Sequence, residues 1–360
     1  MRIGYFISSH GFGHAARACA VMEQLQILHP VNFYIFTSTP EWFFKNSNSF
    51  PFEYKKIQTD VGLIQSTPFE EDLKKTIMSL EKFIPFSEAF YGSFLQYLSQ
   101  INLDLIVCDI SPLGLWVADQ LEIPSILIEN FTWDWIYENY SEDYPELNEF
   151  IPFFREIYQY PKLHFACVPF CQLSENSIVT PPVFRESKSE QGKIRKQLGV
   201  QENEQLILVT MGGIPIDQIG EDNHRIPENL KFIIPINNTN NNSSNANIIY
   251  LPHNHSYFHP DLVNASDLVI GKLGYSTIAE VYSLNKPFLY IGRERFRESK
   301  ILEKFVLEHL NAKEINQSNI FSIDTVEKIQ NALLETKVPH TAINGASQIA
   351  ETILMHYFKH

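Results

Sequence analysis

A glycine-containing turn between an apolar run and an amphipathic segment is the first candidate for chemistry. The turn spans Gly271, Lys272, Leu273 and Gly274 and continues through Tyr275, Ser276 and Thr277. A strand, a glycine turn and a helix start place backbone N–H groups in a row, which suits a phosphate. Glu280 follows Ser276 by one helical turn, so its carboxylate could bind a ribose diol beside that phosphate. An ordinary strand–helix turn with Ser276 as the N-cap explains the same pattern.

A second candidate lies near the start of the chain, where an apolar run ends in a loop with Gly11, Gly13 and His14. The pattern is Gly-x-Gly-His, so the Gly-x-Gly-x-x-Gly fingerprint of an NAD site is incomplete. His14 falls in the first turn of an expected helix, where the dipole favours a neutral imidazole. A neutral imidazole can act as a general base, although a solvated loop histidine is the simpler interpretation.

Two aspartates follow later strands of the same half. Asp109 ends the apolar run 103–109, and Asp134 comes shortly after the run 125–128. The carboxyl ends of parallel strands share one edge of a sheet, so we expect these residues near His14. Asp109 could orient a histidine or could cap a helix.

The elements that must position these residues alternate between strands and helices, which predicts an α/β fold. Strands are expected at 3–7, 31–36, 103–109, 125–128, 164–169, 206–211, 230–234 (stopped by Pro235), 248–251, 268–270 and 287–291. Helices are expected at 15–28, over most of 69–100 with a break at Pro85, from 111 to 121, and at 188–198, 258–265, 278–284, 299–310, 323–335 and 343–358.

The 360 residues suit two domains better than one. We expect domains at 1–172 and 187–338, a linker at 173–186, where periodicity is lost, and a terminal helix at 339–360 that crosses back to the first domain. Each half begins with a strand followed by glycines, and Gly212 and Gly213 provide that turn in the second half.

Composition narrows the function classes. The net charge of −14 argues against nucleic acid as a partner. The four cysteines are scattered, which predicts free thiols in a reducing compartment and no metal site. The first apolar run is too short for a signal peptide, and no run reaches the roughly 18 apolar residues of a membrane span. We therefore expect a soluble cytoplasmic protein.

Several ordered motifs, taken together, resemble the N-terminal, glycosyltransferase-like half of plant arabinokinases. The similarity covers roughly residues 1–310, and the sugar-kinase half of those proteins is absent. The motifs are the stretches 10–17, 60–62, 130–137, 265–280 and 295–298. More distantly, the layout is similar to the bacterial GlcNAc transferase that makes lipid II. The resemblance implies the GT-B fold, two Rossmann-like domains facing a central cleft, with the acceptor in the first and a nucleotide-sugar donor in the second.

The resemblance also implies roles for residues. Gly212-Gly213 and the Gly274, Thr277 and Glu280 pattern match that family's donor site, while Tyr275 replaces a small residue and 295–298 replaces a glutamine-rich sugar-reading segment. The implied reaction is an inverting, metal-independent transfer from a nucleotide-diphosphate sugar, with UDP expected as the nucleotide. The implied base is His14, oriented by Asp109 or Asp134. The implied donor contacts are Gly11, Gly13, Lys272 or Arg293, Ser276, His253 at the nucleobase, and Arg295 and Glu298 at the sugar.

Two alternatives stay open. Asp109, Asp134, Glu280 and Glu298 could surround a sugar in an epimerase or hydrolase of nucleotide sugars. A binding module without turnover is the other. No cofactor is expected beyond the nucleotide sugar as co-substrate. The acceptor (small molecule, lipid-linked or glycan), the donor sugar, the oligomeric state and any peripheral membrane contact are left open.

Overall fold

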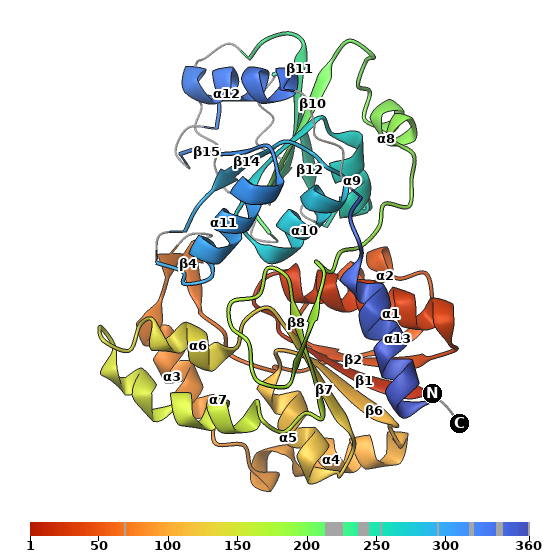
Figure 1. Ribbon diagram of the computed structural model, residues 1–360, viewed down its shortest axis with the longest axis vertical. Helices are drawn as coiled ribbons and strands as arrows, with labels where there is room; N and C mark the ends of the chain where they lie inside the picture. Colours follow the sequence, from red (N-terminus) through yellow and green to blue (C-terminus); the bar gives the residue numbers. More distant parts are fainter. Residues whose placement is uncertain are drawn as a thin grey trace. The chain divides into compact units, whose positions relative to one another are not determined.

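The computed structural model describes residues 1–67, 70–212, 226–236, 245–252, 254–293, 295–316, 320–335 and 341–358. The chain divides into two compact units (Figure 1). The N-terminal unit contains Met1–Phe184, Phe296–Glu298 and Asn344–His360. The C-terminal unit contains Arg185–Arg295 and Ser299–Ile343.

The N-terminal unit is built on a parallel sheet of seven strands in the order β3-β2-β1-β6-β7-β8-β9. These strands are β1 Arg2–Ile7, β2 Asn32–Thr37, β3 Phe52–Lys56, β6 Leu105–Asp109, β7 Ser125–Glu129, β8 Leu163–Cys167 and β9 Ser177–Thr180. A small antiparallel hairpin joins β4 Gln65–Thr67 to β5 Glu70–Glu71. The helices of this unit are α1 Gly13–Leu28, α2 Glu41–Ser47, α3 Leu73–Phe83, α4 Glu88–Ile101, α5 Pro112–Gln120, α6 Trp133–Glu138, η1 Pro145–Glu149, α7 Ile151–Ile157 and α13 Gly345–Tyr357.

The strand order reverses between β1 and β6. From β1 the chain runs through α1 to β2 on one side, and from β6 it runs through α5 to β7 on the other. Because such crossovers are right-handed, α1 and α5 cover opposite faces of the sheet. The loops after β1 and β6 therefore separate at this point, which is where open α/β sheets bind ligands.

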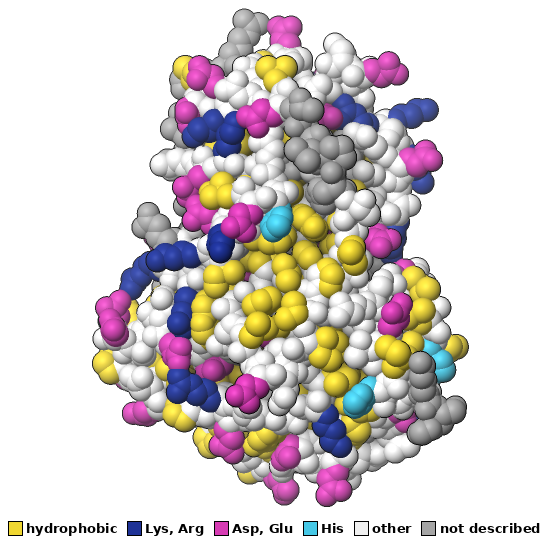
Figure 2. All heavy atoms as spheres, viewed as in Figure 1, with side chains coloured by type: hydrophobic (Ala, Val, Ile, Leu, Met, Phe, Trp, Pro, Cys, Tyr) yellow, Lys and Arg dark blue, Asp and Glu magenta, His cyan; other side chains and the backbone are white. Residues whose placement is uncertain are grey.

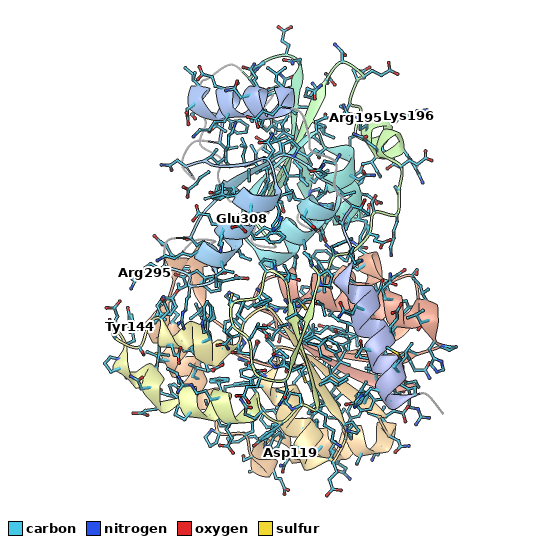
Figure 3. The ribbon with its side chains drawn as sticks, viewed as in Figure 1. Asp119, Tyr144, Arg195, Lys196, Arg295 and Glu308 are labelled. Atoms are coloured by element: carbon cyan, nitrogen blue, oxygen red, sulfur yellow. The ribbon has the colours of Figure 1, made fainter. Side chains whose placement is uncertain are left out.

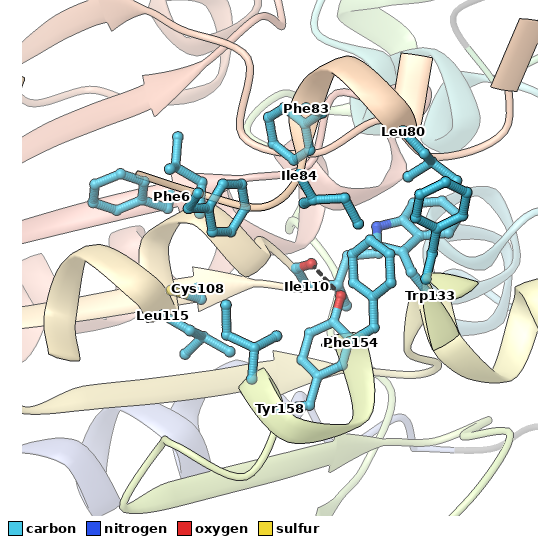
Figure 4. Close-up of a cluster of buried hydrophobic side chains, with 14 of the residues drawn as sticks. Phe6, Leu80, Phe83, Ile84, Cys108, Ile110, Leu115, Trp133, Phe154 and Tyr158 are labelled. Carbon is cyan, nitrogen blue, oxygen red and sulfur yellow. Dashed lines mark hydrogen bonds between the residues drawn. The ribbon is translucent and has the colours of Figure 1, made fainter. Parts of the chain in front are cut away.

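A large apolar core lies behind that edge (Figure 4). It joins Phe6 of β1, Cys108 of β6 and Leu115 of α5 to Leu80 of α3 and Trp133 of α6. Within it the Tyr158 hydroxyl donates to the carbonyl of Ile110, 2.9 Å away. The Ile110 backbone has a φ of 47°, so this buried bond helps hold an uncommon turn directly after β6.

The C-terminal unit repeats the plan with six parallel strands in the order β12-β11-β10-β13-β14-β15. They are β10 Gln205–Thr210, β11 Leu230–Ile236, β12 Ile248–Pro252, β13 Leu268–Lys272, β14 Phe288–Ile291 and β15 Ala312–Glu314. The helices are α8 Gln191–Gln197, α9 His259–Ala265, α10 Tyr275–Ser283, α11 Ser299–His309 and α12 Ile323–Leu334. Here the order reverses between β10 and β13.

Two segments from the later part of the chain belong to the N-terminal unit. Helix α13 packs against α1, and the two lie side by side in Figure 1. The three residues Phe296–Glu298 also join this unit, although both flanking stretches belong to the C-terminal unit.

The expected strands and helices are confirmed, with shifted ends, and two expectations are wrong. Strand β11 does not stop at Pro235 but runs to Ile236. Its pairing with β10 ends at Ile233, so Pro235 pairs only with β12 and the missing N–H does not interrupt the centre of the sheet. Residues Ser177–Thr180, inside the expected linker, form edge strand β9.

Candidate functional site

The carboxyl edge of the N-terminal sheet gathers a buried polar network. Helix α1 begins at Gly13, directly after the loop that follows β1, so His14 and Arg17 lie one turn apart on one face. Asp109 ends β6 and pairs in register with Ile7, and Asn130 follows β7. The parallel ladder therefore delivers these four side chains to one place.

His14 and Asp109 form a buried histidine–carboxylate pair within this network. Nδ1 of His14 lies 2.8 Å from Oδ1 of Asp109, and the two side chains are 7% and 0% exposed. NH2 of Arg17 also lies 3.2 Å from Nδ1, but it donates to Oδ1 of Asp109 over the shorter distance of 2.7 Å. Because an ionised carboxylate only accepts hydrogen bonds, the closer Asp109 contact assigns the proton to Nδ1 and leaves the lone pair on Nε2. Within the described residues, Nε2 has no hydrogen-bond partner. The imidazole is thus held in the tautomer of a general base.

Arg17 keeps Asp109 charged. Its Nε and NH2 donate to Oδ2 and Oδ1 of Asp109 at 2.8 and 2.7 Å, and the side chain is 1% exposed. Burial opposes the charge of Asp109, but the Arg17 guanidinium and the hydrogen bonds from Arg17 and His14 hold its pKa below the ordinary value. The interpretation of Asp109 as a helix cap is wrong. Ser111 caps α5 instead.

Asn130 extends the network to Glu298. Arg17 NH1 donates to the Asn130 amide oxygen at 2.7 Å, and the Asn130 amide nitrogen donates to Oε1 of Glu298 at 2.7 Å. Glu298 is 3% exposed. The contact of this carboxylate with sugar hydroxyls stays a prediction, and in the structure the side chain is enclosed within the N-terminal unit.

Asp60 and a group of aromatic rings form a wall beside this network. Trp133 Nε1 donates to Oδ2 of Asp60 at 2.8 Å, and burial raises the pKa of Asp60. The His10 ring lies edge-on to Trp133, at 5.2 Å between centroids, and stacked with Phe296 at 6.0 Å. Asp60 also interacts electrostatically with His14.

Asp134, the other candidate to orient His14, is not in this network. It lies in the first turn of α6, where Nε of Arg155 is 4.0 Å from its Oδ2. A carboxylate is favoured at a helix N-terminus, which accounts for its position. Among the described residues it makes no interaction with His14.

The C-terminal unit places its glycine turns at the matching reversal point. Gly212 follows β10 with a φ of 66°, as Gly11 follows β1 with a φ of 76°. Gly271 of β13 pairs with Thr210 of β10, and a Cβ there would lie 2.9 Å from the Thr210 carbonyl oxygen. Only glycine fits such a close approach. The buried Lys272 side chain lies next to Gly212.

Helix α10 begins at this edge with Gly274 as its N-cap and no side-chain cap. The interpretation of Ser276 as the N-cap is therefore wrong. Within the described residues, the backbone N–H groups of Gly274, Ser276 and Thr277 have no acceptor. Tyr275, the first helical residue, is 6% exposed and turned into the core. This helix start presents N–H groups of the kind that bind phosphate.

Glu280 does not present an open carboxylate. Arg185 Nε donates to its Oε1 at 2.9 Å, and Nδ1 of His259 lies 2.7 Å from its Oε2. The carboxylate is 1% exposed, and although burial opposes its charge, Arg185 and His259 hold its pKa below the ordinary value. The ribose contact of Glu280 stays a prediction.

The remaining residues predicted to contact the donor are two arginines, three glycines and one histidine. Arg295 is exposed and extends away from the ribbon (Figure 3), while Arg293 is 6% exposed. Gly11 and Gly13 lie where expected, in the loop before α1 and at its first residue. Gly213 and His253 lie outside the described residues.

Comparison with known proteins decides the family. A model of glycosyl transferase family 1 matches residues 1–333. The chain belongs to this family. The glycosyltransferase is 25% identical to L-arabinokinase of Arabidopsis thaliana over 315 residues, which are 84% of this chain and 29% of that protein. The resemblance to arabinokinases is confirmed over that part, and the chain corresponds to less than a third of that relative's length.

Solved structures show the same fold at low identity. MurG of Acinetobacter baumannii matches with a TM-score of 0.56 and 16% identity, covering 98% of this chain and 99% of that one. A UDP-glucosyltransferase of Polygonum tinctorium matches with a TM-score of 0.60 and 10% identity, covering 100% and 99%. SnogD of Streptomyces nogalater matches with a TM-score of 0.57 and 11% identity, covering 99% and 99%. The GT-B fold of the glycosyltransferase is confirmed.

Two residues of the glycosyltransferase site, Arg185 and His259, were not predicted from the sequence. Arg17 and Asn130 fall within the motif stretches 10–17 and 130–137, but no role was predicted for either. The spacing of Arg17 from His14 was the one available signal, because residues three apart share a helix face. Arg185 and Glu280 are 95 residues apart in sequence, so no local pattern joins them.

The described part of the glycosyltransferase shows neither a cluster of metal-binding side chains nor a helix long and apolar enough to cross a membrane. All four cysteines are free. On the face shown in Figure 2, acidic and basic side chains are mixed with one another.

Proposed function

We propose that this glycosyltransferase moves a sugar from a nucleotide-diphosphate sugar, with UDP as the nucleotide, to an acceptor hydroxyl with inversion at the anomeric carbon. The observation that carries the proposal is the His14–Asp109 pair. The pair leaves Nε2 of a mostly buried imidazole with a lone pair and no protein partner among the described residues. A base of this kind can activate an acceptor hydroxyl by taking its proton.

In the proposed step, Nε2 of His14 takes the proton of the acceptor hydroxyl while the acceptor oxygen bonds to the anomeric carbon. The bond from that carbon to the phosphate oxygen breaks, and the nucleoside diphosphate leaves with the electron pair. Asp109 stabilises the imidazolium that forms, because its charge lies 2.8 Å from Nδ1. A single displacement of this kind inverts the anomeric centre.

The leaving diphosphate gains negative charge, and the start of α10 supplies opposite charge. The N–H groups of Gly274, Ser276 and Thr277 and the ammonium of Lys272 lie at one edge of the C-terminal sheet. Preorganised donors of this kind stabilise a developing anion. The proposed step is therefore metal-independent. The use of UDP is supported by the fold shared with a protein described as a UDP-glucosyltransferase.

The four free cysteines fit a reducing compartment, so we place the protein in the cytoplasm. The proposed partners are the nucleotide sugar and an acceptor with a free hydroxyl.

The epimerase alternative has less support. It needs carboxylates turned toward the sugar, yet Asp109, Glu280 and Glu298 are each at most 3% exposed and bonded to neighbouring side chains.

The test begins with thermal shift over a panel of UDP-, GDP-, ADP- and dTDP-sugars. The UDP-sugars are expected to raise the melting temperature. Release of UDP is then measured with a library of sugar, lipid-linked and small-molecule acceptors. The proposal fails if none of the nucleotide sugars stabilises the protein, or if UDP-sugars are converted to a new sugar without any acceptor.

A further inference from the structure

Residues Phe296–Glu298 belong to the N-terminal unit although they lie within a stretch of sequence that otherwise belongs to the C-terminal unit. Their neighbours Arg295 and Ser299 belong to the C-terminal unit, while the three residues themselves belong to the N-terminal unit. NH1 of Arg297 donates to the Trp135 carbonyl at 2.6 Å and to Oε2 of Glu138 at 2.9 Å. Its guanidinium lies 4.1 Å from the centre of the Trp135 ring. The segment is therefore anchored on α6.

The anchored segment brings Glu298 to the far end of the His14 network. Glu298 accepts from the Asn130 amide, whose oxygen accepts from Arg17. Arg17 in turn donates twice to Asp109, and Asp109 accepts from Nδ1 of His14. Each link has a fixed direction, because a carboxylate only accepts and a guanidinium only donates. Glu298 therefore fixes the amide orientation of Asn130 that Arg17 requires.

The charges of this network depend on Glu298 as well. Arg17 carries one positive charge between two carboxylates, Asp109 and Glu298, in surroundings that are at most 3% exposed. With Glu298 present, the group has a net negative charge beside His14. With it removed, the guanidinium would neutralise Asp109 and weaken the stabilisation of the imidazolium.

We propose that Glu298 is a positioning residue for His14, acting through Asn130, Arg17 and Asp109. The inference rests on the proposed function in one respect, the role of His14 as a base. It assigns to Glu298 a task in proton transfer in place of the sugar recognition expected from the sequence.

Other charges also act on this group. Asp60 interacts with His14, and Glu129, which is fully enclosed at the end of β7, interacts with Arg17 and Asp109. Both stay unchanged in the test below, so differences between variants report Glu298 alone.

The test compares Glu298→Gln, Glu298→Ala and the matched control Glu138→Gln, a carboxylate that binds the same segment through Arg297 but has no contact with Asn130. Glu298→Gln keeps an acceptor for Asn130 and removes the charge. Glu298→Ala removes both. The first readout uses no substrate: nitrogen chemical shifts of His14 in the folded protein give the tautomer, with His14→Ala identifying the signals. We expect a mixed tautomer in Glu298→Ala and the native tautomer in Glu138→Gln.

The second readout is the pH profile of turnover. In Glu298→Ala we expect kcat to fall roughly tenfold, because Glu298 acts only through the hydrogen-bond partners of His14. The KM for the donor should be unchanged. In Glu298→Gln the acidic limb of kcat/KM should move to lower pH, because one negative charge is gone. A sugar-contacting role predicts the reverse pattern, a raised donor KM with an unchanged pH profile.

The inference is overturned if the His14 tautomer is the same in Glu298→Ala as in the parent protein, or if Glu138→Gln changes it as much. These outcomes are separate from failure of the proposed function, in which His14→Ala retains turnover. Melting temperatures of all variants are measured, and if Glu298→Ala fails to fold, Glu298→Gln provides the comparison.

Discussion

Both units hold a histidine, a carboxylate and an arginine together at the edge of a parallel sheet. In the N-terminal unit these are His14, Asp109 and Arg17, and in the C-terminal unit they are His259, Glu280 and Arg185. The histidines differ in their second nitrogen. Nε2 of His259 lies 3.1 Å from the Thr210 hydroxyl, whereas Nε2 of His14 has no hydrogen-bond partner among the described residues.

This difference distinguishes His14, a general base, from the structural cluster of His259, Glu280 and Arg185, which we call the brace. A histidine with both nitrogens bonded holds elements together, and His259 joins β10 to α10 in this way. A histidine with one nitrogen bonded to a carboxylate and the other open can accept a proton from a substrate. The same three residue types thus provide chemistry in one unit and stability in the other.

The largest expected effect tests the two histidines against each other. His14→Ala should lower kcat by about 10²- to 10⁴-fold, the usual contribution of a general base, with little change in melting temperature. His259→Ala should lower the melting temperature and change kcat by less than about tenfold, since its loss opens a brace. Initial rates of UDP release and thermal melts check both. Equal losses of turnover in the two variants would contradict the assignment.

The next effect concerns the brace itself. Glu280→Ala removes the carboxylate that lies 2.8 Å from NH2 of Arg185, in a buried ion pair whose Glu280 is 1% exposed, so the C-terminal unit should lose about 3–5 kcal/mol of unfolding free energy. Urea denaturation followed by circular dichroism and by peptide-level hydrogen exchange measures this loss.

The N-terminal unit contains all four tryptophans, Trp42, Trp116, Trp133 and Trp135. The urea midpoint followed by tryptophan fluorescence should therefore be the same in Glu280→Ala as in the parent protein. As a control, Glu41→Gln breaks an exposed pair with Lys45 and should cost less than about 0.5 kcal/mol. A shifted fluorescence midpoint with unchanged exchange in the C-terminal unit would reverse the prediction.

The two units should differ in their stability at acidic pH. The pKa of Glu280 is lowered in the fold, so its contribution to stability is present above the unfolded pKa and is lost as the pH falls through the folded pKa. Asp109 behaves the same way, but burial raises the pKa values of its neighbours Asp60 and Glu129, and their protonation on acidification offsets the loss.

We therefore expect the C-terminal unit to lose protection first between about pH 5 and pH 3. Hydrogen exchange at stepped pH, corrected for intrinsic rates, measures both units in one sample. Earlier opening of the N-terminal unit would show that Asp109 dominates its neighbours.

The smallest expected effect concerns the start of α10. Thr277→Val removes a hydroxyl beside the proposed diphosphate site and should weaken UDP binding about fivefold, equivalent to one hydrogen bond. Ser283→Ala, at the other end of the same helix, removes a hydroxyl bonded to the Glu280 carbonyl and should leave binding unchanged. Isothermal titration compares the two. Equal weakening would place the binding effect in helix stability and not at the N-terminus.

The local pattern was sufficient for the α/β class and for most of the central strands and helices. Apolar runs such as 206–209 and glycine turns after the first strand of each half indicate parallel α/β units, because period and turn chemistry are properties of neighbouring residues. The nearness of Asp109 to His14 was also predicted, since both lie at strand ends that share one sheet edge. The choice of Asp109 over Asp134 as the partner of His14 came only from the tertiary structure.

Long-range partners were decided only by the tertiary structure. Glu280 and Glu298 look alike in sequence, as acids beside a glycine turn or an arginine-rich stretch. Arg185 and His259 enclose the first, and Asn130, 168 residues away, holds the second. A charge is stable in an enclosed site only when distant parts of the chain supply its partners, and spacing along the sequence carries no record of that requirement.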